Sequence, residues 1–317
     1  MRPFEKYPIL TQLLKPLRKS QRTTLGLIVA ATIEASAARS MEIATLLSEW
    51  LDVRFDSALN RFYRLLRNCR VADHLLTQQL LAALSGKLGK TLLIAIDWTE
   101  WRDPLRMLVA SVLTDRRAIP VHTGAYDKRK IRRSQNSQEN TFLRLLKMVL
   151  QKAGLNAIIL CDRGFRRASW LKLLLELRLH FVIRLMSDVH VHLPKKRRSR
   201  SLARQGLRPG GVVDLGAVAL RKDGVVQVRV VGVWMPGAKE PWWLATDLTC
   251  EVQKLVAYYD RRMAIEEQLR DTKGCRFGLK LEWTQFKNPA HLARFALVVG
   301  IAILVWTAAG IAAAKER

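Results

Sequence analysis

Residues 258–273, YYDRRMAIEEQLRDTK, have the composition of an α-helix that ends at Gly274. The stretch contains no proline or glycine and is rich in residues with high helix propensity. At about 100° per residue, four of its polar side chains fall within about 60° of one another on one face. These side chains are Tyr259, Arg262, Glu266 and Lys273. The spacing therefore selects Glu266, and not Glu267, as the carboxylate that stands among two cations and a phenol.

The same charge spacing is also common on solvated helices, where Arg262 and Glu266 would form an exposed ion pair. Two segments upstream favour a functional role, because each is a strand-like apolar run that ends at an acid. Asp97 follows LLIAI and Asp162 follows AIILC. Three acids delivered by two strand ends and one helix suit a site for hard divalent cations.

These motifs together resemble those of DDE transposases of the insertion-sequence-four family. Residues 97–99 read DWT and residues 162–165 read DRGF. The spacing Y-x2-R-x3-E-x6-K of that family is matched at every position from Tyr259 to Lys273. The resemblance covers the chain from roughly Lys90 onward.

The resemblance implies an RNase H-like catalytic core for DNA cleavage and strand transfer at transposon ends, through a hairpin intermediate. Asp97, Asp162 and Glu266 would be the catalytic acids and would hold two Mg2+ ions, for which Mn2+ can substitute. Phosphates near the cut would be held by three further side chains, Tyr259, Arg262 and Lys273. The implied partners are double-stranded DNA, as terminal inverted repeats and target, and a second copy of the chain in the DNA complex.

An excess of basic residues indicates a polyanionic partner. The chain of 317 residues has 54 Lys and Arg against 27 Asp and Glu, a formal charge of +27. Such an excess repels itself unless a polyanion is bound, so nucleic acid is the first choice and an anionic membrane surface the second. Hydrophobic residues make up 49% of the chain, which excludes wholesale disorder. The four cysteines form no C-x2-C pair, which fits a reducing cytoplasm.

The order of apolar segments predicts an α/β fold in four parts, with a mixed sheet flanked by helices. Residues 1–90 read as an all-helical DNA-end-binding domain and connector, and residues 91–188 as the first part of the RNase H-like core. Residues 189–247 read as a β-rich insertion. Residues 248–317 read as the second part of the core, with the Glu266 helix and a C-terminal apolar helix.

Two helices in the first part, over residues 42–51 and 56–68, have the spacing of a helix-turn-helix. Leu59, Phe62, Tyr63 and Leu66 form the apolar stripe of the second helix. Ser57 and four further polar residues lie off this stripe, and those four are the candidate DNA contacts: Asn60, Arg61, Arg64 and Arg67. An ordinary amphipathic pair in a bundle remains the alternative, and the family resemblance favours DNA binding.

The insertion contains adjacent tryptophans and a basic run. In the resembled family a tryptophan in a W-L-x-T context stacks on a flipped base, and Trp243 stands in WLAT. Its distance to Tyr259 is short for that role, so Trp242 is the alternative, and packing in a small sheet is a third interpretation. The run KKRRSRS over residues 195–201 is either a solvated loop or a phosphate contact.

Residues 295–314 carry no charge and are long enough to span a bilayer. A helix packed against the central sheet has the same composition, and we expect that arrangement and no membrane partner. Glu100 and Asp103 are the other acids close to Asp97, and we expect them to face solvent or form salt bridges. A catalytically silent DNA-binding protein descended from a transposase is the alternative function.

Overall fold

The computed structural model describes residues 2–68, 70, 72–101, 104–115, 117–131, 135–194, 198–220, 225–274 and 278–315. Asp103, residues 195–197 of the basic run and two of the cysteines, Cys69 and Cys275, lie outside these ranges.

The chain divides into two compact units, each described by itself. Unit 1 comprises Met1–Lys90, Trp98–Gly154 and Ala264–Arg317, and unit 2 comprises Thr91–Asp97 and Leu155–Met263. The four-part division stays a prediction.

The N-terminal segment of unit 1 is helical, as its composition predicts. Its elements are η1 (Pro3–Lys6), α1 (Pro8–Leu14), α2 (Lys19–Glu34), α3 (Ser40–Leu51), α4 (Phe55–Arg67) and α5 (Asp73–Leu88). Between α3 and α4 the chain turns at Asp52, which has a left-handed φ of 49°. The buried side of α4 is formed by Ala58, Phe62, Leu65 and Leu66, so the apolar stripe lies slightly further round the helix than predicted, and Leu59 and Tyr63 are half-buried.

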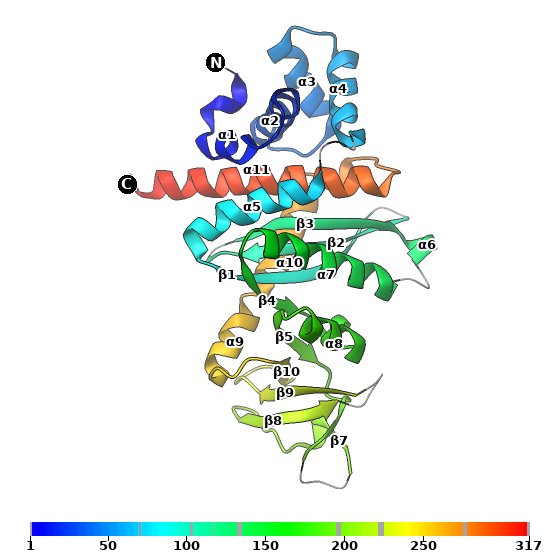
Figure 1. The fold of residues 1–317 in the computed structure, drawn as a ribbon, viewed down its shortest axis with the longest axis vertical. Coiled ribbons are helices and arrows are strands. Elements are labelled where there is room, and N and C mark those ends of the chain that lie inside the picture. The colour runs from blue at the N-terminus through cyan, green and yellow to red at the C-terminus, as the bar shows by residue number, and fades with distance from the viewer. Residues whose placement is uncertain are drawn as a thin grey trace. The chain divides into compact units, whose positions relative to one another are not determined.

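A long apolar helix, α11 (Pro289–Lys315), forms the centre of unit 1 (Figure 1). It packs against strand β3 (Ala118–Asp127) on one side and against α2 on another. The two backbones come close at Gly300, where a Cβ atom would lie 2.4 Å from the carbonyl oxygen of Pro120. By length and composition α11 could cross a membrane, but 56% of its apolar window is buried in the protein. Burial of this kind is typical of a core helix.

The remaining elements of unit 1 surround a β-hairpin. Strand β2 (Leu105–Leu113) pairs antiparallel with β3. The helices are α6 (Lys128–Ile131), α7 (Gln135–Lys152), α10 (Met263–Lys273) and η4 (Leu281–Trp283). Helix α10 is fixed to the hairpin by a hydrogen bond from Ser111 Oγ to Gln268 Oε1 at 3.1 Å.

Unit 2 is built on a mixed sheet with the strand order β1-β4-β5-β10-β9-β8-β6-β7. Its strands are β1 (Thr91–Glu100, of which Thr91–Asp97 belong to this unit), β4 (Asn156–Cys161), β5 (His180–Leu185), β6 (His190–His192), β7 (Arg200–Ser201), β8 (Val212–Leu220), β9 (Val226–Val233) and β10 (Trp242–Thr246). Strands β1, β4 and β5 are parallel, whereas β10 pairs antiparallel with both β5 and β9. The β-rich residues 189–247 therefore continue the same sheet.

The helices of unit 2 are α8 (Ala168–Glu176) and α9 (Val252–Asp260), with the short 3-10 helices η2 (Arg163–Phe165) and η3 (Leu202–Arg204). Both α8 and α9 contact β5. The large mixed sheet and its flanking helices confirm the predicted α/β class.

The single helix predicted over residues 258–273 is wrong, because the chain turns between α9 and α10. The N–H of Arg262 donates to the carbonyl of Tyr259 at 3.0 Å, three residues back instead of four. The Arg262 side chain is buried, so a tertiary contact overrides the local helix propensity here. The common face of Tyr259, Arg262, Glu266 and Lys273 therefore does not exist as one continuous helical face.

Candidate functional site

In unit 2, the paired residues of two neighbouring parallel strands are each followed by an aspartate at the same position along the sheet. Ile96 of β1 pairs with Cys161 of β4, and the next residues are Asp97 and Asp162. Neighbouring strands lie about 4.8 Å apart, so the two carboxylates start close together. Hydrophobic burial of both strands produces this register, since residues 92–96 and 157–161 are all buried. The two apolar runs thus end at paired positions, directly before the two acids that the sequence analysis selected.

Asp162 is held by the turn that follows β4. Its Oδ1 accepts a hydrogen bond of 2.9 Å from the N–H of Gly164. A Cβ atom at Gly164 would lie 3.0 Å from the same oxygen, so the glycine of the DRGF motif permits this close approach. The turn formed by the sequence DRG therefore orients the Asp162 carboxylate.

Asp97 faces the guanidinium of Arg262. Nη1 of Arg262 lies 3.4 Å from Oδ2 of Asp97, and the two side chains are 6% and 18% exposed. The buried cation compensates a carboxylate that is itself mostly removed from water. The guanidinium also lies 5.6 Å from the centroid of the Tyr259 ring. Arg262 thus contacts a predicted catalytic acid directly.

Tyr259 is a buried, neutral phenol in this cluster. Burial raises its pKa above the ordinary value, and this effect outweighs the opposing influence of Arg262 and Arg184. The Trp242 ring meets the Tyr259 ring edge-on, with centroids 5.0 Å apart and planes at 75°. The aromatic pair therefore lies beside the Arg262 guanidinium.

The two adjacent tryptophans have different environments. Trp243 is 1% exposed, and a Cβ atom at Gly232 would lie 2.4 Å from its ring. Trp242 is half-buried and contacts Tyr259. Of the three interpretations of this segment, core packing fits Trp243 in this structure, and Trp242 is the tryptophan that contacts Tyr259.

Sequence reasoning missed Arg184, on β5, and Glu240. Nη2 of Arg184 lies 2.7 Å from Oε1 of Glu240, and Nη1 of Arg163 lies 3.5 Å from the same oxygen. Arg184 also influences the Tyr259 hydroxyl electrostatically. The signal in the sequence was a single cation in the apolar strand HFVIRL.

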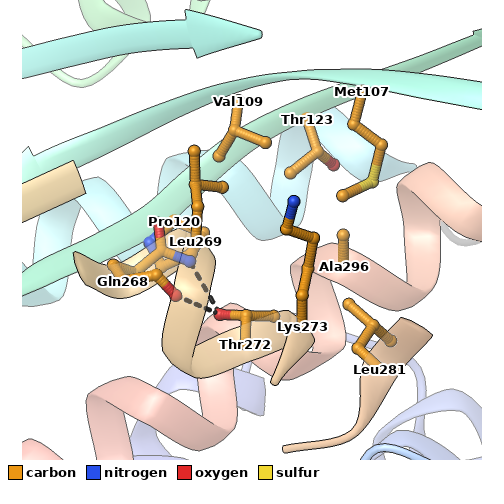
Figure 2. Close-up of a pocket in the computed structure, with 10 residues that line it drawn as sticks. All are labelled: Met107, Val109, Pro120, Thr123, Gln268, Leu269, Thr272, Lys273, Leu281 and Ala296. Atoms are coloured by element: carbon orange, nitrogen blue, oxygen red, sulfur yellow. Dashed lines mark hydrogen bonds between the residues drawn. The ribbon is translucent and has the colours of Figure 1, made fainter. Parts of the chain in front are cut away.

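Helix α10 carries Glu266, the predicted third acid, in unit 1. Glu266 and Glu267 are both exposed on this helix. Lys273, at its end, extends into a small pocket between α10, the β2–β3 hairpin and α11 (Figure 2). Its Nζ lies 3.4 Å from the carbonyl oxygen of Glu100. Lys273 is half-buried and is directed at the protein backbone in this structure.

A divalent cation suits the donors that the chain offers. Carboxylate oxygens are the ligands that Mg2+ and Mn2+ prefer, and Asp97 and Asp162 supply them from adjacent strands. Within the residues that the structure describes, no group of three His, Cys, Asp or Glu side chains is gathered as a cation site. Glu266 belongs to the other unit, so its part in such a site stays a prediction.

The remaining predicted residues lie where the sequence analysis expects polar side chains. Glu100 forms ion pairs with Arg106 and Lys128, which confirms its salt-bridge interpretation. The candidate DNA contacts of α4 are all exposed: Asn60, Arg61, Arg64 and Arg67.

Comparison with known proteins identifies the type of domain. Residues 124–304 match the family model described as transposase DDE domain. The match includes Asp162 and Glu266, whereas Asp97 lies before it. No curated protein matches the chain.

Among solved structures, the X-ray structure of Marinitoga piezophila Argonaute in complex with 5′ OH guide RNA and target DNA shares 11% sequence identity with the chain at a TM-score of 0.27. That alignment covers 76% of this chain and 34% of the Argonaute, so the chain spans about a third of its length. Similarity at this level supports no conclusion about fold or function.

Proposed function

This chain belongs to the transposase DDE domain family, and from that premise we propose that it is the transposase of a bacterial insertion sequence, which cuts and joins DNA at the ends of its element. The observation that carries the proposal is the in-register pairing of β1 with β4 up to Ile96 and Cys161, the residues directly before Asp97 and Asp162. The parallel strands β1, β4 and β5 and the antiparallel β2–β3 hairpin are consistent with an RNase H-like core.

Three acids are assigned to the metal site in this proposal. Asp97, Asp162 and Glu266 would hold two Mg2+ ions, and Mn2+ would substitute because it prefers the same oxygen ligands. Bound ions would lower the pKa of an attacking water or 3′-hydroxyl and stabilise the leaving oxygen of an in-line displacement.

The cations and aromatic side chains around Asp97 and Asp162 would orient the DNA. Arg184 is supported as a phosphate contact by its electrostatic influence on the Tyr259 hydroxyl, and Trp242 as the base-stacking residue by its half-buried ring on the same tyrosine. Phosphate contacts by Tyr259, Arg262 and Lys273 stay predictions. We include a hairpin intermediate on the family resemblance.

The rest of the chain is assigned to DNA recognition. The charge of +27 and the exposed polar face of α4 support binding to the terminal repeats. Double-stranded DNA is the substrate, two copies of the chain would assemble on it, and we place the protein in the cytoplasm.

The deciding experiment is nicking of a supercoiled plasmid by the full chain with Mg2+ or Mn2+. We expect the wild-type chain to nick, and Asp97→Asn or Asp162→Asn to abolish nicking while DNA binding in a gel shift is retained. Glu266→Gln should be equally inactive, and Glu267→Gln, on the same exposed stretch of α10, is its matched control. Loss in Glu267→Gln with retention in Glu266→Gln would contradict the assignment of the third acid.

A silent DNA-binding protein descended from a transposase is the second candidate, because Arg262 already compensates Asp97. That function predicts DNA binding without nicking under any metal condition. The plasmid assay with the wild-type chain therefore separates the two functions.

A further inference from the structure

The residue after Asp97 is held by a buried carboxylate. Nε1–H of Trp98 donates a hydrogen bond of 2.7 Å to Oε1 of Glu139, on helix α7. Glu139 is 1% exposed, and the same oxygen accepts 2.9 Å from Nε2 of Gln135. A buried carboxylate is costly unless it is hydrogen-bonded, and its bonds are stronger than those of a neutral acceptor.

The Trp98 ring also contacts the side chains of Arg106 and Tyr126. The guanidinium of Arg106 lies 4.3 Å from the ring centroid, within the range of a cation–π contact. The Tyr126 ring lies 5.5 Å from it at a tilt of 58°. Burial and the charge of Glu139 raise the pKa of Tyr126 to about 12, so this neighbour is neutral. Trp98 is therefore held by one hydrogen bond and two ring contacts.

A second set of contacts holds Glu100, two residues after Trp98 on β1. Nε of Arg106 lies 3.6 Å from Oε1 of Glu100, Lys128 pairs with the same carboxylate, and Lys273 reaches the Glu100 carbonyl. Alternate residues of a strand share a face, so Trp98 and Glu100 face one way and the Asp97 side chain faces the other. The end of β1 is thus fixed from the face opposite to the Asp97 carboxylate.

We propose that Glu139 is a positioning residue for Asp97 and acts through Trp98. The proposal rests on the proposed function, in which Asp97 is a metal ligand. Ligand geometry must hold within about 0.5 Å for productive chemistry. The clamp of Glu139, Trp98 and Arg106 meets this need, because it fixes the backbone at the residue bonded to Asp97.

Nothing in the sequence motifs of Asp97, Asp162 or Glu266 points to Glu139. Its signal lies in the amphipathic pattern of α7, where an acid occupies the apolar face three and four residues before Phe142 and Leu143.

The test compares Trp98→Phe and Glu139→Ala with the wild-type full chain. Trp98→Phe keeps an aromatic ring under Arg106 but loses the N–H donor, and Glu139→Ala loses the acceptor. We expect both to weaken Mn2+ binding about tenfold, measured by electron paramagnetic resonance of free Mn2+ without DNA, because groups that orient a metal ligand have effects of this size. The nicking rate at saturating DNA should fall in parallel, while the DNA dissociation constant stays unchanged.

Two further variants separate positioning from stability. Glu139→Gln retains an oxygen acceptor and should recover most of the Mn2+ affinity and nicking rate. Trp170→Phe removes the same ring atoms from a buried tryptophan whose Nε1 has no hydrogen-bond partner in the described part of the chain. It should lower the melting temperature without changing Mn2+ affinity.

The proposal is overturned if Trp98→Phe and Glu139→Ala bind Mn2+ and nick DNA like the wild-type chain, or if Trp170→Phe shows the same loss of Mn2+ affinity. Failure of the proposed function has a different signature, because the wild-type chain would then fail to nick DNA. The Mn2+ titration compares the variants even in that case.

Discussion

At the scale of single residues, the Asp97–Arg262 pair sets the charge balance of the acidic site. Arg262 supplies a buried positive charge where a divalent cation is proposed to bind, so a bound metal ion would compete with the guanidinium for one carboxylate. A metal ion would replace the compensation that the guanidinium provides. Substitution of Arg262 should therefore couple protein stability to metal concentration.

We predict that Arg262→Ala lowers the free energy of unfolding by about 1–3 kcal/mol without metal, because Asp97 loses its buried partner. Mn2+ should raise the melting temperature of this variant more than that of the wild-type chain, since ligand binding stabilises the folded state. Thermal unfolding over a Mn2+ titration measures both effects. Arg261→Ala is the neighbouring control, and an equal Mn2+ shift in all three proteins would contradict the competition.

We predict different effects for alanine substitutions at the two adjacent tryptophans, Trp242 and Trp243. Trp243→Ala should cost about 3–5 kcal/mol of stability and reduce every activity together, because the side chain is buried. Trp242→Ala should spare the first nick and slow hairpin formation about tenfold to a hundredfold, the cost of one lost base stack. Nicking, hairpin yield and melting temperature on both variants separate these outcomes. A hairpin defect in Trp243→Ala with a wild-type melting temperature would return the stacking role to Trp243.

At the scale of elements, the packing of α11 against β3 holds unit 1 together. The helix passes so close to Pro120 that position 300 has no room for a side chain. Interiors are packed at crystal-like density, so an added methyl group must displace the helix or the strand.

We predict that Gly300→Ala destabilises the protein by about 1–3 kcal/mol through overpacking. Gly310→Ala is the matched control on the same helix, because nothing lies within 4 Å of its Cβ position. That change should be neutral or stabilising by up to about 1 kcal/mol, since alanine has the higher helix propensity. Chemical denaturation of both variants measures the difference, and equal effects would show that α11 is not held against β3 as described.

At the scale of the whole molecule, the charge of +27 dominates association with DNA. Each phosphate that is neutralised lowers the logarithm of the binding constant by about 0.9 per decade of salt. The exposed cations of α4 decide whether that attraction becomes specific, because base contacts carry sequence information and phosphate contacts do not.

We predict that affinity for any duplex falls steeply between low and physiological salt. Arg64→Ala should weaken binding to the element's terminal repeat more than binding to random DNA if the α4 face reads bases. If Arg64 contacts only phosphate, both affinities should fall equally and the salt slope should decrease by about one. Fluorescence anisotropy at several salt concentrations distinguishes the two cases, and no effect on either DNA would remove Arg64 from the interface.

The sequence by itself determined the features that depend on local pattern. Apolar runs that end at Asp97 and Asp162 predict buried strands with acids at their ends, and the composition of residues 1–90 predicts helices. Net charge follows from composition alone. These features need no knowledge of distant contacts, because strand and helix periodicity act over a few residues.

Only the tertiary structure decided the features that depend on contacts between residues far apart in the chain. The helix is interrupted at Arg262, and the guanidinium of this residue contacts Asp97. Trp243 is buried against Gly232, and Trp98 donates a hydrogen bond to Glu139. No local propensity encodes these outcomes. They arise because burial of a charge or a large ring is favourable only where the folded chain supplies a partner or a matching space.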